Sequence, residues 1–183
     1  MSDSLLIEQC KQYNRKAQMT LYNTYCDGMF AIAKRYLKDT AEAEDAMQEA
    51  FIKAFQKLSQ YQGEVTFGAW LKRIVINTCL DAIKAKRLEL FPLNEETYKL
   101  VDSEADEGWG MAEDTNITEV LAAIEELPIN YKTAVKLFLL EGYDHQEISE
   151  ILQISENASR TYLHRGKTRL KEKLKNMRYG TGY

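Results

Sequence analysis

The sequence predicts an all-α protein of two small helical domains that are joined by a flexible acidic linker. Apolar residues recur at spacings of three and four along most of the 183-residue chain, which is the period of an amphipathic helix. Two prolines and nine glycines are too few for a turn-rich β-protein. Residues 94–119 hold nine acidic side chains and one lysine, a composition typical of a linker. We therefore expect a first domain over residues 1–91, the linker over 92–116, a second domain over 117–178 and a tail over 179–183.

The first domain contains four helical patterns and one longer loop, SQYQGEVT at residues 59–66. Asp39 or Thr40 is expected to cap the third pattern, whose apolar stripe includes Met47 and Phe51. The expected helices cover residues 4–13, 16–37, 41–58 and 67–87. The expected core face of the fourth helix consists of Phe67, Trp70, Leu71, Ile74 and Ile83.

Another face of the fourth helix is basic. Arg73, Asn77 and Lys84 recur on it at spacings of four and seven, and Lys72 adds charge beside them. A basic helix with an amide at its centre can hold phosphates and contact unpaired bases. The same pattern also fits a solvated basic face, which is the commoner case for an isolated helix.

The second domain contains a helix-turn-helix pattern between Asp144 and Leu170. Asp144 can accept hydrogen bonds from the first turn of a short helix, and Glu147 three residues later completes a capping box. Residues 153–155 form the expected turn, after which Ser155 can cap a second helix. Together these features predict a DNA-binding fold of the helix-turn-helix type.

The second helix of this motif carries a candidate base-reading face and many positive charges. Asn157, Arg160, Thr161 and His164 share one face near its N-terminus, where a recognition helix presents side chains to base edges. The following basic residues suit phosphates. A solvated amphipathic helix, with basic residues favoured by its own dipole, is the alternative interpretation. The inward face is expected to consist of Ser159, Leu163, Gly166, Leu170 and Leu174.

Composition excludes several classes of protein. Three widely spaced cysteines and two histidines without partners at ligand spacing predict a cytoplasmic protein with no disulfide framework, no metal site and no cofactor. The sequence begins without a signal-peptide pattern, and no stretch approaches the ~20 apolar residues of a membrane span, so we expect no membrane insertion. The chain has no nucleophile-plus-base motif, no paired carboxylates in an apolar pattern and no phosphate-binding loop, so we expect no enzyme activity.

Two stretches of the first domain, AEDAMQEAFIKAFQKL and FGAWLKRIVINTCLDAIKAKR, closely resemble region 2 of extracytoplasmic function (ECF) sigma factors of bacterial RNA polymerase. EELPINYKTAVKLFLLEGYDHQEISEILQIS and SRTYLHRGKTRL resemble region 4 of the same family. The segments occur in the family's order, on either side of a linker of suitable length. The chain departs from the family where Asn157-Ala158-Ser159 replaces a common Gly-Thr-Val and where Tyr162 replaces a common arginine. The resemblance therefore predicts the fold of this helix but does not predict which −35 DNA sequence it reads.

The resemblance implies a sigma factor that binds core RNA polymerase and promoter DNA and directs transcription initiation. Asp45, Gln48 and Glu49 match the surface that docks on the clamp helices of the largest subunit, and region 4 matches the module that meets the flap of the second largest. An anti-sigma factor is a further implied partner. The matched −10 residues are Lys72, Arg73, Asn77 and Lys84, with Gln62 and Gly63 in the loop that captures a flipped base. The matched −35 residues are Asn157, Ser159, Arg160, Thr161, His164, Arg165 and Lys167.

Two alternatives to a sigma factor lack polymerase docking. One is a helix-turn-helix transcriptional regulator, which should carry a receiver or ligand domain, but the first domain lacks the alternating strands that a receiver needs. The other is a helical protein that only binds partners, which the two basic, polar-faced helices disfavour. Transcription directed by the purified chain with core polymerase would separate these functions.

Overall fold

A computed structural model describes residues 3–90 and 116–180 of the chain. The chain divides into two compact units, Met1–Glu95 and Glu96–Tyr183. Each unit is entirely helical over the described residues, which confirms the predicted fold class. Most of the predicted acidic linker lies outside the described residues.

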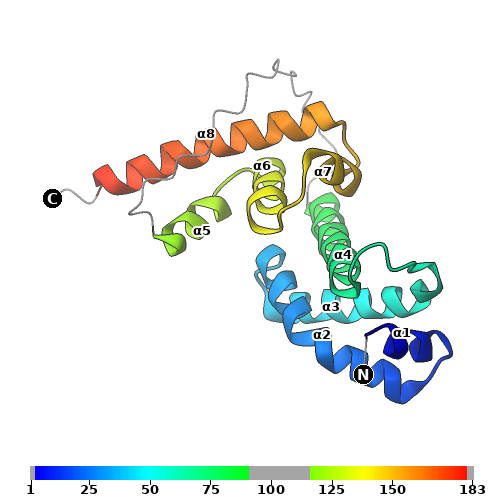
Figure 1. Ribbon diagram of the computed structural model, residues 1–183. Helices are drawn as coiled ribbons and strands as arrows, with labels where there is room; N and C mark the ends of the chain where they lie inside the picture. Colours follow the sequence, from blue (N-terminus) through cyan, green and yellow to red (C-terminus); the bar gives the residue numbers. More distant parts are fainter. Residues whose placement is uncertain (1–2, 91–115, 181–183) are drawn as a thin grey trace. The chain divides into compact units, whose positions relative to one another are not determined.

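Within the described residues 3–90, the first unit contains four α-helices and one 3₁₀ turn (Figure 1). Asn14 caps α2 by accepting hydrogen bonds from the backbone N–H groups of Lys16 and Ala17, and Asp39 caps α3 in the same way through Glu42. Side-chain oxygens at these positions satisfy donors that the helix itself leaves unpaired. The elements are α1 (Asp3–Lys11), α2 (Arg15–Tyr36), α3 (Thr40–Gln56), η1 (Leu58–Gln60) and α4 (Phe67–Leu90).

The core of the first unit lies where α2, α3 and α4 pack against one another. The predicted core face of α4 is only partly correct. Phe67 and Leu71 are buried, but Trp70, Ile74 and Ile83 are only half-buried. Because α4 packs against both α2 and α3, its buried arc is wider than a single apolar stripe and is rotated away from Trp70. The buried residues that the prediction missed are Val75, Ile76, Thr78, Cys79 and Leu80.

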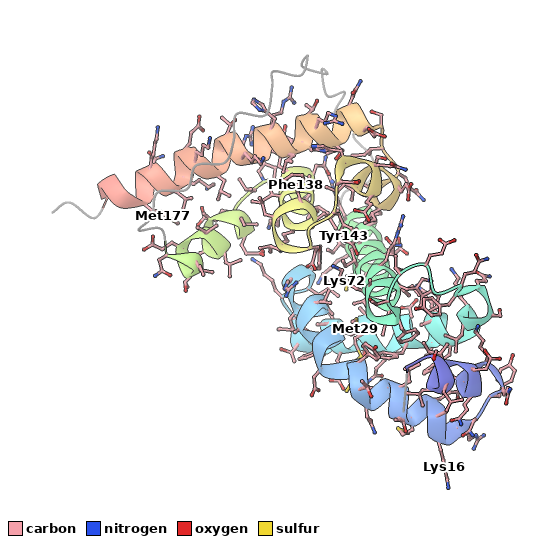
Figure 2. The ribbon with its side chains drawn as sticks, in the orientation of Figure 1. Lys16, Met29, Lys72, Phe138, Tyr143 and Met177 are labelled. Atoms are coloured by element: carbon pink, nitrogen blue, oxygen red, sulfur yellow. The ribbon has the colours of Figure 1, made fainter. Side chains whose placement is uncertain are left out.

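The second unit is organised around its long C-terminal helix. α8 packs against α5, α6 and α7. Phe138 and Met177, labelled in Figure 2, pack against the edge of the core that these helices form. The elements are α5 (Ile117–Glu125), α6 (Ile129–Val135), the π-helical turn η2 (Lys136–Leu140), α7 (His145–Leu152) and α8 (Glu156–Gly180). The core consists of Val120, Ala123, Ile124, Leu127, Val135, Leu163 and Leu170.

Gly166 sets how closely α8 approaches α6. A Cβ atom at this position would lie 2.5 Å from Cγ2 of Val135 and 3.3 Å from the backbone oxygen of Tyr131. Any side chain here would push the two helices apart, because Val135 is fully buried and has no free space to enter. The prediction that Gly166 faces inward is therefore confirmed.

No helix in the described part of the chain is long and apolar enough to cross a membrane.

Candidate nucleic-acid and polymerase interfaces

The predicted docking residues form an exposed polar face on α3. Asp45, Gln48 and Glu49 are all exposed, and Glu49 forms an ion pair of 2.8 Å with Lys53 one turn later. Ile52 follows on the same face, with 58% of its surface exposed. Ile52 was not among the predicted docking residues, although its position seven residues after Asp45 places it on this face. The result is a carboxylate-bearing surface with one apolar side chain among its charges.

The predicted −10 residues of α4 fall on the side that faces away from the core. Arg73 and Asn77 are half-buried and Lys84 is exposed. The helical period brings half-buried Trp70 and Ile74 to the same side, so the surface combines cationic, amide and aromatic groups. Lys72, labelled in Figure 2, is half-buried and lies about 100° around the helix from Arg73.

The loop before α4 is held in one shape by its aromatic residues. The Tyr61 hydroxyl donates a 2.7 Å hydrogen bond to the backbone oxygen of Val65, which closes the loop on itself. The Tyr61 ring lies 5.7 Å from the Phe67 ring and 5.3 Å from the Trp70 ring, measured between centroids. Gly63 has a φ of 80°, which a side chain would strain. Such a loop can present a preformed cavity.

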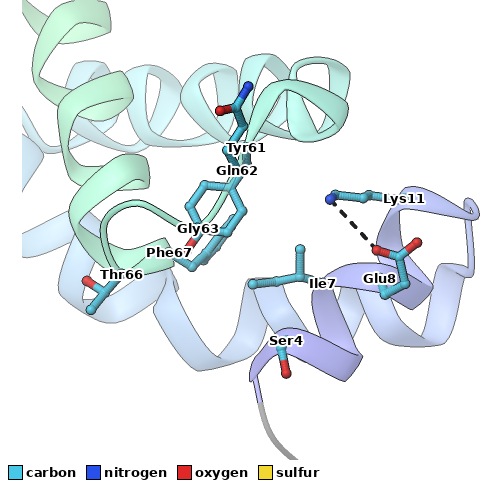
Figure 3. Close-up of a pocket in the computed structure, with 9 residues that line it drawn as sticks. All are labelled: Ser4, Ile7, Glu8, Lys11, Tyr61, Gln62, Gly63, Thr66 and Phe67. Carbon is cyan, nitrogen blue, oxygen red and sulfur yellow. Dashed lines mark ion pairs between the residues drawn. The ribbon is translucent and has the colours of Figure 1, made fainter.

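A cavity of about 440 Å³ lies between this loop and α1 (Figure 3). Ile7 of α1 faces the loop, and an ion pair of 3.7 Å between Lys11 and Glu8 lies beside it. The loop side includes the predicted residues Gln62 and Gly63. The α1 wall of the cavity was not predicted, because more than 45 residues separate it from the loop and no local pattern links them. The lining residues are Ser4, Ile7, Glu8, Lys11, Tyr61, Gln62, Gly63, Thr66 and Phe67.

The helix-turn-helix begins and turns as predicted. The Asp144 carboxylate accepts a 2.8 Å hydrogen bond from the backbone of Glu147, whose own carboxylate accepts one of 3.0 Å from the backbone of Asp144. The capping box is therefore confirmed. Gln153 makes the turn with a φ of 55°, and the Ser155 hydroxyl caps α8 by accepting from Ala158. These contacts fix the start of α8 directly after the turn of the helix-turn-helix.

The predicted base-reading face of α8 is open to solvent. Asn157, Arg160 and His164 are exposed, and Thr161 beside them is half-buried. The Arg160 guanidinium lies 3.7 Å from the carboxylate of Glu156, one turn earlier. An exposed pair of this kind contributes little stability, so Arg160 can leave it for a base edge at small cost.

Ser159 and Lys167, both predicted to contact DNA, point into the second unit instead. Ser159 is fully buried and its Oγ lies 3.0 Å from Nδ1 of His145. Lys167 is 9% exposed, and its ammonium lies 4.9 Å from the centre of the Phe138 ring. Both residues lie on the inner side of α8, where they stabilise helix packing rather than face a duplex. The burial of Ser159 agrees with the inward face predicted for this helix, and burial of the two residues does not support their predicted contact with DNA.

Arg165, the remaining predicted residue of this set, is half-buried at the edge of α8. Its guanidinium donates a 3.4 Å hydrogen bond to the hydroxyl of Tyr131. The next arginine, Arg169, is exposed, and its guanidinium lies 5.1 Å from the centre of the Tyr131 ring. Tyr131 thus orients two arginines along one side of the helix.

Burial and ion pairing shift the pKa of some groups in the two units. Burial raises the pKa of Cys79 to about 12 and also raises that of Cys10, so both thiols are protonated at neutral pH. A hydrogen bond from Lys173, reinforced by its charge, lowers the pKa of Glu126. This pair, at 2.6 Å, joins the end of α5 to α8.

Comparison with known proteins agrees with this division into two units. The chain matches the family described as Sigma-70 region 2 over residues 21–89 and the one described as Sigma-70, region 4 over residues 117–170. The ECF RNA polymerase sigma-E factor of Haemophilus influenzae is 28% identical and the match covers 95% of this chain and 96% of that protein. The ECF sigma factor SigW of Bacillus subtilis is also 28% identical, with 93% and 96% covered.

Solved structures share the fold. CnrH in complex with the cytosolic domain of CnrY aligns with a TM-score of 0.57 at 20% identity, covering 93% of this chain and 96% of that one. The sigma factor RpoE of Bartonella quintana, crystallised with the anti-sigma factor NepR, aligns with a TM-score of 0.58 at 18% identity, covering 86% and 96%. Both matched regions, their order and the full-length relatives lead to one conclusion: the chain belongs to the ECF class of the sigma-70 family, whose members direct core RNA polymerase to promoters.

Proposed function

We propose that the two units divide promoter recognition between them, the first binding and opening the −10 element and the second reading the −35 element. The observation that carries this division is that each unit presents a separate polar surface suited to bases. Arg73 and Asn77 lie on α4 in the first unit, and Asn157 and Arg160 lie on α8 in the second. Neither surface belongs to the hydrophobic core of its unit.

The polar face of α3 is the proposed polymerase contact. Asp45, Gln48 and Glu49 offer carboxylate and amide groups to a basic partner surface, the clamp helices of the largest subunit. Ile52 supplies apolar area at the centre of this face, where a buried anchor contributes most to binding. The second unit is proposed to meet the flap of the second largest subunit.

The α4 surface and the cavity below the loop are the proposed −10 site. Arg73 and Lys84 can hold phosphates while the Asn77 amide bonds an exposed base edge. Lys72, on the neighbouring side of α4, adds charge to this surface. A base taken out of the helix stack needs an apolar surface to stack on and polar groups at its edges, and Phe67 and Gln62 both line the cavity. The closed loop supports this role because it requires no reorganisation when a base enters.

Asn157, Arg160, Thr161 and His164 are proposed to read base edges of the −35 element from the N-terminal half of α8. Arg165 lies beside them and suits a phosphate. We also propose that the protein acts in the cytoplasm, where its partners, RNA polymerase and promoter DNA, are found. We propose no enzyme activity for it. An anti-sigma partner is proposed as well, because the similar sigma factor RpoE was crystallised in complex with the anti-sigma factor NepR.

Run-off transcription with core RNA polymerase and genomic fragments tests the proposal. The full chain should direct initiation at defined start sites whose upstream sequences share two elements. A chain that binds these fragments but directs no transcription would indicate a helix-turn-helix regulator. A chain that binds neither DNA nor polymerase would indicate a helical protein with other partners.

A further inference from the structure

A buried polar contact joins the two helices of the helix-turn-helix. His145 is the first residue of α7 and Ser159 is the fourth of α8, and His145 Nδ1 lies 3.0 Å from Ser159 Oγ. Ser159 has no exposed surface. A buried hydroxyl without a partner is costly, so this contact favours one placement of α8 relative to α7.

The His145 ring is held from a second side. It stacks on Phe138 with ring centres 5.5 Å apart and an angle of 27° between the planes. The ammonium of Lys167 lies 4.9 Å from the centre of that same phenyl ring. Phe138 belongs to η2, so its ring contacts both His145 of α7 and Lys167 of α8. The stack on Phe138 restrains the plane of the imidazole, and within that plane Nδ1 faces the Ser159 hydroxyl.

Ser159 lies in the same helical turn as the proposed base-reading residues. Asn157 and Arg160 are its near neighbours in sequence but project from the exposed side of α8. A helix moves as a rigid body over so short a distance, so a displacement at Ser159 moves the reading side chains by a similar amount. An error of about 1 Å is enough to disturb directional hydrogen bonds to base edges.

We infer that His145 is a positioning residue for −35 recognition, which it serves by holding Ser159 and so setting where the reading end of α8 lies. The inference rests on the proposed role of α8 as the −35 reader. Packing between apolar residues alone would let α8 slide or rotate slightly, whereas a directional bond selects one register.

Four variants of the full chain test this role. Ser159→Ala removes the hydroxyl, and His145→Asn keeps a polar group near the position of Nδ1. The double variant His145→Phe/Ser159→Val replaces the polar pair with an apolar one. Ser149→Ala is the matched control, because the Ser149 hydroxyl donates only within α7, to the backbone of Gln146. Each variant is assayed as holoenzyme for the ratio of its affinities for the matched −35 sequence and for one with a changed base.

Ser159→Ala and the double variant should lower this ratio roughly tenfold, as losing one base contact would. His145→Asn should retain most of the ratio, and Ser149→Ala should retain all of it. The double variant restores apolar packing, so a stable fold with poor discrimination separates positioning from stability. A wild-type affinity ratio in Ser159→Ala or in the double variant would overturn the inference. The inference would also fail if His145→Asn lowered the ratio as much as Ser159→Ala does.

Nitrogen NMR of the two histidines tests the contact without DNA. His164 is exposed and should exchange between tautomers, whereas His145 should show a single tautomer. Ser159→Ala should shift the ring nitrogens of His145 and leave those of His164 unchanged. Unchanged His145 signals would overturn the inference by themselves. If wild-type holoenzyme shows no −35 preference while the nitrogen signals behave as expected, the proposed reading role of α8 fails and the contact stands.

Discussion

Replacing Gly166 with alanine should weaken the second unit, although alanine is normally the better helix former. The new Cβ would lie 2.5 Å from Cγ2 of Val135, far inside the roughly 3.5–4.0 Å at which carbon atoms attract. It would also lie 3.3 Å from the backbone oxygen of Tyr131, which cannot rotate away. Relief therefore requires α8 to move away from α6.

The expected cost follows from two opposing terms. Overpacking a close-packed core costs about 1–3 kcal/mol. Replacing a helical glycine with alanine gains about 0.5–1 kcal/mol. The net free energy of unfolding of the second unit should fall by about 0–2.5 kcal/mol, with a central value of about 1 kcal/mol. That central value corresponds to roughly 4–8 °C in melting temperature for a domain of this size. Because α8 carries the proposed reading face, −35 affinity should fall as well.

Hydrogen exchange of the full chain, read on peptides from α6 and α8, measures this loss in the second unit alone. Gly28→Ala is the matched control, because a Cβ at Gly28 in the middle of α2 would meet nothing within 4 Å. It should stabilise the first unit by about 0.5–1 kcal/mol. The double variant Gly166→Ala/Val135→Ala removes Cγ2 of Val135 and with it the close contact. Its loss of stability should therefore be smaller than the sum of the losses in the two single variants. A Gly166→Ala variant as stabilised as Gly28→Ala would refute the reasoning.

Three further substitutions test the proposed surfaces. Reversing Asp45 and Glu49 to lysine should abolish binding to core polymerase with an unchanged circular dichroism spectrum, whereas a lost helical signal would indicate a structural role. Asn77→Ala should impair promoter opening, measured by permanganate footprinting, more than closed-complex binding, and equal defects would contradict a role in melting. Arg160→Ala should cost on the order of 1–3 kcal/mol at one −35 position and relax its preference, while uniform weakening would identify a phosphate contact.

Features that depend on neighbouring residues were predictable from the sequence. The Asp144–Glu147 capping box, the Ser155 cap and the inward face through Leu163 and Gly166 all appear in the structure. Capping needs only residues three apart, and helical periodicity needs only a few turns of chain. The exposed face of Asp45, Gln48 and Glu49 was predictable for the same reason.

Features that depend on how the helices pack were decided by the tertiary structure. The α4 core face was misassigned because two partner helices, α2 and α3, widened its buried arc to include Val75 and Cys79. Lys167 was predicted to lie among the DNA-facing basic residues, but its ammonium packs over Phe138 of η2. Periodicity placed Ser159 on the inward face, but it could not identify its partner His145, which comes from α7.

The sequence by itself determined the helices, their caps, the two-unit order and the family resemblance, because hydrogen bonding and amphipathic spacing are local. Only the tertiary structure determined the cavity between α1 and the loop, the contact between His145 and Ser159, and the close approach at Gly166. Each of these joins residues 14 or more positions apart, and such contacts depend on the relative placement of whole helices. That placement follows from the summed packing of many side chains, which no short sequence pattern encodes.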